Sequence, residues 1–416
     1  METKEFLLGL FHTALAAVEP ARVVPGHLPE PPPGRTVVIA AGKAAAVMAR
    51  AVEDNWSEPL SGLAVTRYGH GVPCQRIEVI EAGHPYPDDV GQAAAGRALG
   101  LVSGLGADDL ALFLISGGGS ALLARPAPGL SLADKQTVTH ALLASGATIS
   151  EINCVRKHLS AIKGGRLAEA ASPARIATLV ISDVPGDDPA TVASGPTLAD
   201  PTTLAEASDV LAAHAISPPP AIVRHLADPA NETPKSLPAT DVWIVARAAD
   251  ALNAAATRAS DVGLETAILG DDLQGEARDL AADHARLARD GGPSLLLSGG
   301  ETTVTVGPAG GRGGRNAEYL LALALALDGD KRIHAIACDT DGIDGTEDNA
   351  GAIIGPDTLV RARALGLDAR AMLEAHDTHG FFAALGDLVV TGPTRTNVND
   401  FRAILIGAGA SQRIDL

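Results

Sequence analysis

The sequence predicts an α/β protein of two domains, the first with a mainly parallel sheet covered by helices on both faces and the second smaller. Three observations predict this fold class. The chain has 416 residues, which is too many for one ordinary hydrophobic core. Short apolar runs alternate with alanine-rich stretches of helical length in both halves. Hydrophobic residues make up 46% of the chain beside 45 glycines and 27 prolines, which is typical of a globular fold with many short connections.

The first half opens with an apolar stretch that we predict to be an amphipathic helix ending before Pro20. Glu2 and Glu5 argue against a signal peptide there. Residues 36–41 form a continuous apolar run, which predicts a buried strand, and residues 42–50 give the turn and helix that follow it. We expect further strands at residues 62–66, 76–81, 110–115 and 177–182, and helices at residues 88–102, 131–145 and 150–170.

The periodic pattern weakens between residues 201 and 239, where prolines interrupt the chain. We therefore predict two domains, residues 1–235 and residues 236–416. The second domain begins a new α/β series, with a helix over residues 317–325 and strands at residues 242–246, 266–269, 294–298, 302–306, 333–338, 387–390 and 403–406.

Composition excludes several classes of protein. A formal charge of −18 lacks the basic footprint of a nucleic-acid-binding protein. The three widely spaced cysteines, Cys74, Cys154 and Cys338, suit neither a disulfide framework nor a metal site, which fits a reducing cytoplasm. The sequence has no apolar stretch long enough to span a bilayer, so we expect no membrane partner.

The most informative stretch runs from residue 310 to residue 351. A loop of glycine and arginine leads through Arg315 into a helix, and a short strand then ends in an acidic turn that contains Asp341. Glycine amides and a helix N-terminus attract oxyanions, and an arginine adds two-pronged hydrogen bonds. The carboxylates suit Mg²⁺ or act as a base for a hydroxyl proton. The pattern is typical of phosphoryl transfer; the alternative is a surface turn beside a glycine-rich loop.

A second glycine-rich loop follows the apolar strand at residues 110–115. Its amides and hydroxyls form either a nest for phosphate or a tight turn from strand to helix, and it is neither a Walker A loop nor the G-x-G-x-x-G dinucleotide fingerprint. Asp183 follows another buried strand, where a carboxylate binds a metal or accepts a proton. The loop consists of Ser116, Gly117, Gly118, Gly119 and Ser120.

The main basic cluster lies within the helix predicted over residues 150–170. Helical spacing places Arg156, Ser160 and Lys163 on one face, with Asn153 a turn earlier. The face is either solvated or a dock for phosphates or a substrate carboxylate. Lys43, at the start of a helix directly after a strand, is placed to reach a transferring phosphoryl group.

Taken together, these segments resemble the class II glycerate 2-kinases, the MOFRL-domain family. The matching motifs occur in the family's order over nearly the whole chain: Gly42-Lys43-Ala44-Ala45, Gly83-His84-Pro85-Tyr86-Pro87-Asp88, Ser116-Gly117-Gly118-Gly119-Ser120, the segment from Asn153 to Arg166, Ser182-Asp183-Val184-Pro185-Gly186-Asp187, Ser194-Gly195-Pro196-Thr197, Ser298-Gly299-Gly300-Glu301-Thr302, Gly313-Gly314-Arg315-Asn316, the turn from Asp339 to Gly345 and Gly392-Pro393-Thr394-Arg395-Thr396-Asn397-Val398-Asn399-Asp400. Two departures from the family's pattern are Arg395, where a small residue is usual, and Ala317, where Gln is usual.

The resemblance implies a Rossmann-like N-terminal domain, a C-terminal MOFRL-type domain with a mixed sheet, and an active site in the cleft between them. It implies ATP- and Mg²⁺-dependent phosphorylation of the 2-hydroxyl of D-glycerate to 2-phosphoglycerate in the cytoplasm, and leaves a homodimer open. It places the family's functional lysine, arginine and acid at Lys43, Arg315 and Asp341.

On this reading the loop from Ser116 to Ser120 holds nucleotide phosphates, and Asp183 holds the metal. Arg156 and Lys163 bind either those phosphates or the glycerate carboxylate, and Asp341 accepts the hydroxyl proton or holds the second side of the metal. Family members have also been labelled hydroxypyruvate reductase, so an NAD(P)H-dependent reductase is the alternative, although no G-x-G-x-x-G follows the first strand. A binding module without turnover is the other alternative.

Overall fold

The computed structural model describes residues 3–306 and 310–407 and divides into two compact units. One unit is Pro20–Val245, and the other combines the N-terminal residues through Glu19 with the chain from Ala246 onward. These units differ from the ranges predicted from the sequence, 1–235 and 236–416, because the first helix packs on the second sheet and one more strand joins the first sheet. Below they are called the N-terminal unit and the C-terminal unit.

The sheet of the N-terminal unit has the strand order β3-β2-β1-β4-β5-β6. The first five of these strands pair in parallel, which is the arrangement of a Rossmann-like domain and confirms the predicted fold class. Apolar runs buried from both sides form the two central strands. The bounds are β1 Thr36–Ala41, β2 Leu60–Arg67, β3 Ile77–Ala82, β4 Leu110–Ile115, β5 Arg175–Ile181 and β6 Thr240–Ala246.

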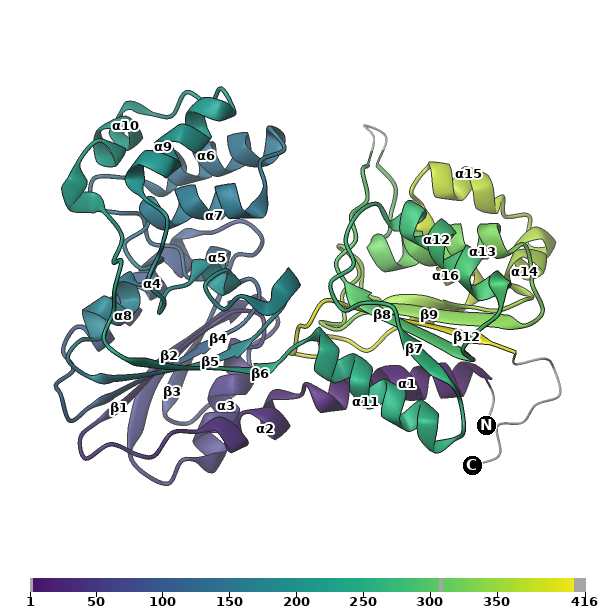
Figure 1. Cartoon of the computed structure of the whole chain (residues 1–416), viewed down its shortest axis with the longest axis horizontal. Helices are drawn as coiled ribbons and strands as arrows, with labels where there is room; N and C mark the ends of the chain where they lie inside the picture. Colours follow the sequence, from purple (N-terminus) through teal and green to yellow (C-terminus); the bar gives the residue numbers. More distant parts are fainter. Residues whose placement is uncertain (1–2, 307–309, 408–416) are drawn as a thin grey trace. The chain divides into compact units, whose positions relative to one another are not determined.

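Helices cover both faces of this sheet (Figure 1). On one face α3 (Ala45–Asn55) packs against the central strands, and on the other α4 (Asp89–Val102) and α8 (Arg166–Ala171) bury their alanines and leucines. The short elements of this unit are α2 Pro20–Val23, α5 Gly119–Leu122, and the 3₁₀ turns Pro25–His27, Pro185–Asp187, Val192–Ser194 and Pro229–Asn231.

Four further helices form a separate layer with its own apolar core (Figure 1). Capping boxes at Ser131 and Thr148 fix the starts of two of them. The single helix predicted over residues 150–170 is wrong, because Gly164 and Gly165 take left-handed φ angles of 57° and 83° in an irregular segment that splits it. The four helices are α6 Leu132–Ala144, α7 Ile149–His158, α9 Leu204–Ala213 and α10 Pro220–Leu226.

The C-terminal unit has a mixed sheet of order β11-β10-β9-β12-β8-β7, as predicted for the smaller domain. Its central strand β12 runs antiparallel to both neighbours. The strand predicted at residues 242–246 instead extends the first sheet as β6, and residues 302–306 form no strand. The bounds are β7 Thr266–Ile268, β8 Leu295–Gly300, β9 Ile333–Asp339, β10 Gly351–Ile354, β11 Leu388–Val389 and β12 Asp400–Ile406.

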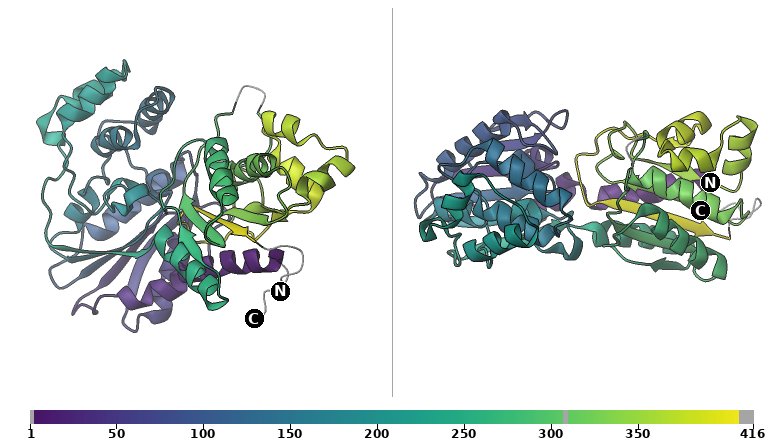
Figure 2. Two further views of the ribbon diagram at one scale, coloured as in Figure 1. Left: turned by 45° about the vertical axis from the view of Figure 1, so that its right-hand side comes forward. Right: turned by 90° about the horizontal axis from the view of Figure 1, so that it is seen from above.

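One face of this sheet carries α1 (Thr3–Ala17) and α11 (Ala248–Asp261) side by side (Figure 1, Figure 2). The other face carries α12 and the almost wholly buried α13. In α1, Phe6, Leu7 and Phe11 are fully buried. The remaining helices are α12 Ala277–Asp290, α13 Arg315–Leu327, α14 Thr358–Ala364, α15 Ala369–Glu374 and α16 Thr378–Leu385.

In the described ranges, no helix by itself has the length and hydropathy needed to cross a membrane. One bent pair, α1 with the turns at Pro20–His27, reaches the threshold by length and composition only.

Candidate functional site

The strand order of the N-terminal unit reverses between the neighbouring strands β1 and β4, so the carboxyl ends of these two strands form a switch point. Ligands bind at this switch point in open α/β sheets. The first loop begins with Gly42-Lys43 and the second with Ser116-Gly117. The Lys43 amide donates to the Gly117 carbonyl at 2.8 Å, and the Ala44 amide donates to Ser116 Oγ at 3.1 Å. The structure thus brings the predicted lysine and the predicted anion loop together.

Two glycines make this approach possible. Gly42 has a φ of 133°, and a Cβ there would lie 2.1 Å from Ser116 Oγ. Gly118 has a φ of 80°, and its Cβ would lie 2.9 Å from His84 Nε2 and 3.3 Å from Lys43 Cγ. A side chain at Gly42 would collide with the backbone of Ser116, and one at Gly118 would crowd the side chains of His84 and Lys43.

A chain of hydrogen bonds connects the anion loop to α7. Ser120 Oγ lies 2.8 Å from Ser194 Oγ, which donates to Asn153 Oδ1 at 3.0 Å. Ser194 has a left-handed φ of 60°, as does its neighbour Ala193 at 52°, a backbone state that non-glycine residues rarely adopt. Asn153 is therefore a buried support for the loop.

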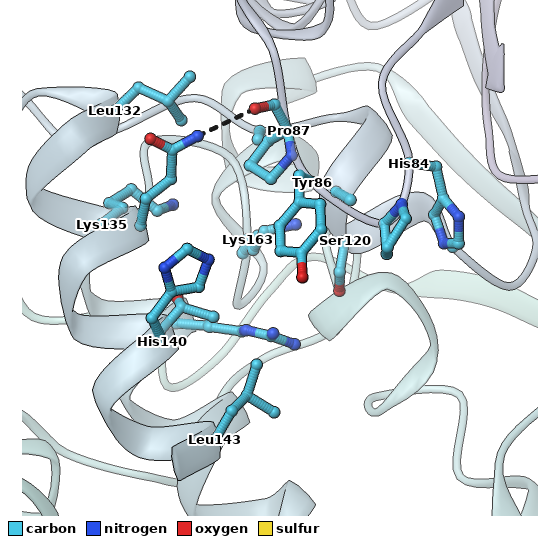
Figure 3. Close-up of a pocket in the computed structure, with 16 residues that line it drawn as sticks. His84, Tyr86, Pro87, Ser120, Leu132, Lys135, His140, Leu143 and Lys163 are labelled. Carbon is cyan, nitrogen blue, oxygen red and sulfur yellow. Dashed lines mark hydrogen bonds between the residues drawn. The ribbon is translucent and has the colours of Figure 1, made fainter. Parts of the chain in front are cut away.

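A cavity of about 360 Å³ in the N-terminal unit opens beside this loop (Figure 3). Ser120, Arg156 and Lys163, all predicted site residues, line it. Arg156 and Lys163 do not share a helix face as expected, because α7 ends at His158 and Lys163 belongs to the segment after it. The fold nevertheless brings both cations to one cavity. Lys157, the neighbour of Arg156 in the sequence, forms a buried ion pair with Asp200 at 3.3 Å instead.

Sequence analysis missed Lys135 on α6, which also lines the cavity. Its Nζ is buried and has no hydrogen-bond partner in the described part of the chain. Burial, reinforced by the charges of Arg156 and Arg166, lowers the pKa of Lys135 to about 7. Burial, and then the charge of Lys135, also lowers the pKa of Lys163 well below its usual value. The chain has only seven lysines, and their scarcity was the available signal.

These three cations have no carboxylate partner among the described residues. Lys135, Lys163 and Arg156 take part in no ion pair there, and Lys163 Nζ donates only to the carbonyls of Leu123 and Ala193, each at 3.4 Å. A cluster of positive charge in a protein of net charge −18 is suited to an anionic ligand.

Asp183 lies two residues beyond the end of β5 and is half-buried. Because β5 pairs with β4 in the register Val180↔Ile115, Asp183 belongs to the same carboxyl edge as the anion loop. Within residues 3–306 and 310–407, no group of three His, Cys, Asp or Glu side chains is arranged to hold a metal ion. Mg²⁺ is commonly bound by one or two carboxylates together with substrate phosphates, so a single carboxylate fits this mode.

In the C-terminal unit, Arg315 is the first residue of α13 and is surrounded by carboxylates. Its Nε contacts Asp400 at 2.8 Å, Nη2 contacts Asp339 at 2.8 Å, and Nη1 faces Glu301 at 3.2 Å. Burial alone would lower the pKa of Arg315, but Asp400 and Asp339 raise it above its usual value. The guanidinium is therefore fixed in place and permanently charged.

The acidic turn after β9 lies beside this arginine. The Asp341 amide donates to Asp339 Oδ1 at 2.9 Å, so Asp339 connects Asp341 to Arg315. Asp341 is buried, and its Oδ1 accepts from the Ile343 amide at 2.8 Å. The structure thus brings two predicted catalytic residues together within one unit, and their roles remain predictions.

Asp344 in the same turn caps α13. Its carboxylate accepts from the amides of Asn316 and Ala317, each at 2.9 Å. Burial raises the pKa of Asp344 to about 6, and the two helix amides oppose the shift only partly. The residue is fully buried, which makes it a structural cap.

Two family descriptions match the chain. One, a domain of unknown function (DUF4147), covers residues 6–227, and the other, the MOFRL family, covers residues 294–400. A D-glycerate 2-kinase of Thermotoga maritima is 38% identical over 407 residues, which cover 95% of this chain and 97% of the relative. The chain belongs to the glycerate 2-kinase family with a MOFRL domain. The crystal structure of a glycerate kinase from the same organism matches with a TM-score of 0.88 at 37% identity, over 97% of this chain and 99% of that one.

The names carried by members of the MOFRL family differ. A protein of Agrobacterium vitis named "Putative hydroxypyruvate reductase" is 55% identical over 418 residues, which cover 98% of this chain and 95% of that protein. The predicted anion loop falls in the first matched region, and Arg315 and Asp341 fall in the second.

We predict that the raised pKa of Asp344 makes the C-terminal unit less stable as pH rises from 4 to 7. The folded state holds the proton up to about pH 6, whereas the unfolded state releases it near the usual value of 3.8. The free energy of unfolding should decrease by about 3 kcal/mol, which corresponds to a decrease of roughly 6–12 °C in Tm. The side chain of Asp344→Asn does not titrate. The difference between the Tm of the wild type and the Tm of the variant should therefore decrease as the pH is raised from 4 to 7. Calorimetry without nucleotide or metal measures it, and a difference that is constant or grows with pH contradicts the prediction.

Proposed function

We propose that the protein phosphorylates D-glycerate at its 2-hydroxyl with ATP and Mg²⁺, giving 2-phosphoglycerate and ADP. The observation that carries the proposal is the close packing of the Lys43 loop on the glycine-rich loop at the switch point of the first sheet, in a chain of the glycerate 2-kinase family. Phosphoryl transfer depends mainly on positioning and on neutralising charge, and this pair of loops supplies amide donors beside a lysine.

We assign each charged residue a role that its position in the fold supports. The amides of the Ser116–Ser120 loop bind phosphate oxygens, and Lys43 adds a point charge beside them. Asp400 and Asp339 occupy Nε and Nη2 of Arg315, so Nη1 is the donor for a phosphoryl oxygen, and the exposed Glu301 is its competitor. Asp341 accepts the proton of the glycerate hydroxyl. Since these residues belong to different units, the proposed active site lies in the cleft between them and requires both units during turnover.

The proposed metal ligand is Asp183, a half-buried carboxylate at the carboxyl edge of the first sheet. Bound Mg²⁺ would neutralise phosphate charge. Asp183 would hold the ion together with phosphate oxygens, since Mg²⁺ in kinases is held this way rather than in a cage of protein ligands. We further propose that the protein acts in the cytoplasm and that nucleic acid and membranes are not its partners.

Hydroxypyruvate reduction with NAD(P)H is the second candidate, favoured by the name of the Agrobacterium relative and by the strand order of the first sheet. A dinucleotide site needs glycines that open the first loop to a pyrophosphate. Here the loop after β1 reads Gly42-Lys43-Ala44-Ala45, and Ser116 occupies the space beside Gly42. The geometry therefore favours the kinase.

Two assays run side by side distinguish the candidates: ADP formation with D-glycerate and ATP, and NAD(P)H oxidation with hydroxypyruvate. We expect only the first to proceed. Lys43→Ala and Arg315→Ala should each lower kcat on the order of a hundredfold, because each removes a charge that stabilises the transition state. The exposed Lys331→Ala serves as the control and should keep full activity. Turnover by Lys43→Ala within about threefold of wild type would show that the role given to this lysine is wrong.

The two acidic residues should respond differently to removal of their charge. Asp341→Asn keeps size and polarity but accepts no proton, so we expect turnover to be abolished while nucleotide binding survives. Asp183→Asn should instead raise the Mg²⁺ concentration needed for half-maximal rate, with partial rescue by excess metal. Rate measurements over a Mg²⁺ series for both variants test this. Exchanged outcomes would exchange the two roles, and normal activity in both variants would remove both residues from the site.

A further inference from the structure

The cavity in the N-terminal unit has two chemically different ends (Figure 3). One end is apolar and aromatic. Leu132, His140 and Leu143 of α6 lie across from Tyr86, whose ring meets His140 edge to face with centroids 5.6 Å apart. Tyr86 and Leu143 are 65% and 56% exposed, so this end is accessible from solvent.

The other end is polar and cationic. Lys135, Lys163 and Arg156 line the cavity together with Ser120, and the described residues place no carboxylate in ion-pair contact with these three cations. Among the residues that the structure describes, the buried Lys135 Nζ has no hydrogen-bond partner, so it is able to bind an anion. A buried cation costs free energy unless an anion meets it.

At Gly118 the wall of the cavity comes close to Lys43. Gly118 lines the cavity, and the space beside its Cα is bounded by Lys43 Cγ and His84 Nε2. A ligand with a chain of phosphates could therefore extend from the three cations along the glycine-rich loop to Lys43.

We propose that this cavity binds the nucleotide, with the base and ribose at the end formed by Tyr86, His140 and Leu143 and the phosphates at the end formed by Lys135, Lys163 and Arg156. The inference rests on the proposed kinase function and assigns Arg156 and Lys163 to the nucleotide rather than to the glycerate carboxylate. It also adds Lys135 as a phosphate-binding residue.

Size and polarity favour this ligand. A volume of about 360 Å³ with a mainly apolar wall suits a molecule with an aromatic base, whereas glycerate is far smaller and wholly polar. Gln136 on the wall donates from Nε2 to the Pro87 carbonyl at 3.1 Å, which leaves Oε1 as an acceptor for an exocyclic amine.

Binding of ADP without glycerate, measured by calorimetry, tests the two ends separately. Leu143→Asp places a charge at the base end, and Lys135→Met removes a phosphate contact while keeping the length of the side chain. We expect each to weaken ADP binding and to raise the KM for ATP roughly tenfold or more, with the KM for D-glycerate unchanged within about twofold. The control is Leu287→Asp, a comparably exposed leucine on α12, which should bind ADP like wild type.

Proton uptake gives a readout that a purely structural role would not change. Free Lys135 is faced by Arg156 of α7, Arg166 of α8 and Lys163, and its pKa of about 7 should rise when phosphates bind. ADP binding at pH 8 should therefore take up protons, measured in buffers of different ionisation enthalpy. The uptake should fall at pH 6, where the amine already carries its proton, and in Lys135→Met.

Two results would overturn the inference: wild-type ADP affinity in both variants, or a rise in the KM for D-glycerate in place of that for ATP. Failure of the kinase function is distinguishable from this. If the wild type bound ADP through this cavity without phosphorylating glycerate, the inferred nucleotide site would be supported, and the proposed substrate would be wrong.

Discussion

The site in the N-terminal unit depends on one contact, between the loop that follows β1 and the glycine-rich loop that follows β4. Ser116 Oγ accepts the Ala44 amide, and the space beside Gly42 is filled by Ser116 itself. This contact fixes where Lys43 leaves the backbone and where the glycine-rich loop turns toward α5. The wall of the cavity begins at that loop, so the position of Lys43 relative to the cavity is set by backbone packing rather than by flexible side chains.

In the C-terminal unit, carboxylates and an amide fix the position of Arg315. Asp400 lies between Arg315 and the fully buried Arg402, and Asn316 Nδ2 donates to it at 2.7 Å. Arg402 offsets part of the negative charge around Arg315, and the carboxylates of Asp400 and Asp339 hold the guanidinium in place. A guanidinium fixed on two sides by carboxylates keeps one nitrogen for a ligand, which is the preorganisation that charge stabilisation requires.

Much of the fold could be predicted because its strands are apolar runs with clear ends. The strands at residues 36–41 and 110–115 have the predicted bounds, since both are buried on two faces. The helix over residues 150–170 could not be predicted correctly, because periodicity continued across Gly164 and Gly165 while the backbone turned there. The place of β6 is a matter of tertiary pairing with β5, which leaves no mark in local sequence.

The candidate site also combines residues that local sequence reveals with residues that only tertiary packing reveals. Lys43, Arg315 and the glycine-rich loop stand next to strand or helix ends, where motif and position agree. Lys135 could not be found in this way, because a lysine on an ordinary helix becomes informative only when folding buries its amine beside Arg156 and Lys163. Burial and the absence of a partner are properties of three-dimensional packing.

The central claim is transfer of a phosphoryl group to the 2-hydroxyl of glycerate, and proton-coupled ³¹P NMR of the product tests it directly. A phosphate ester at carbon 2 couples to a single neighbouring proton, whereas an ester at carbon 3 couples to two. The account predicts a doublet that grows in step with ADP when the protein is given D-glycerate, ATP and Mg²⁺. A triplet, or release of inorganic phosphate without any ester, would contradict it.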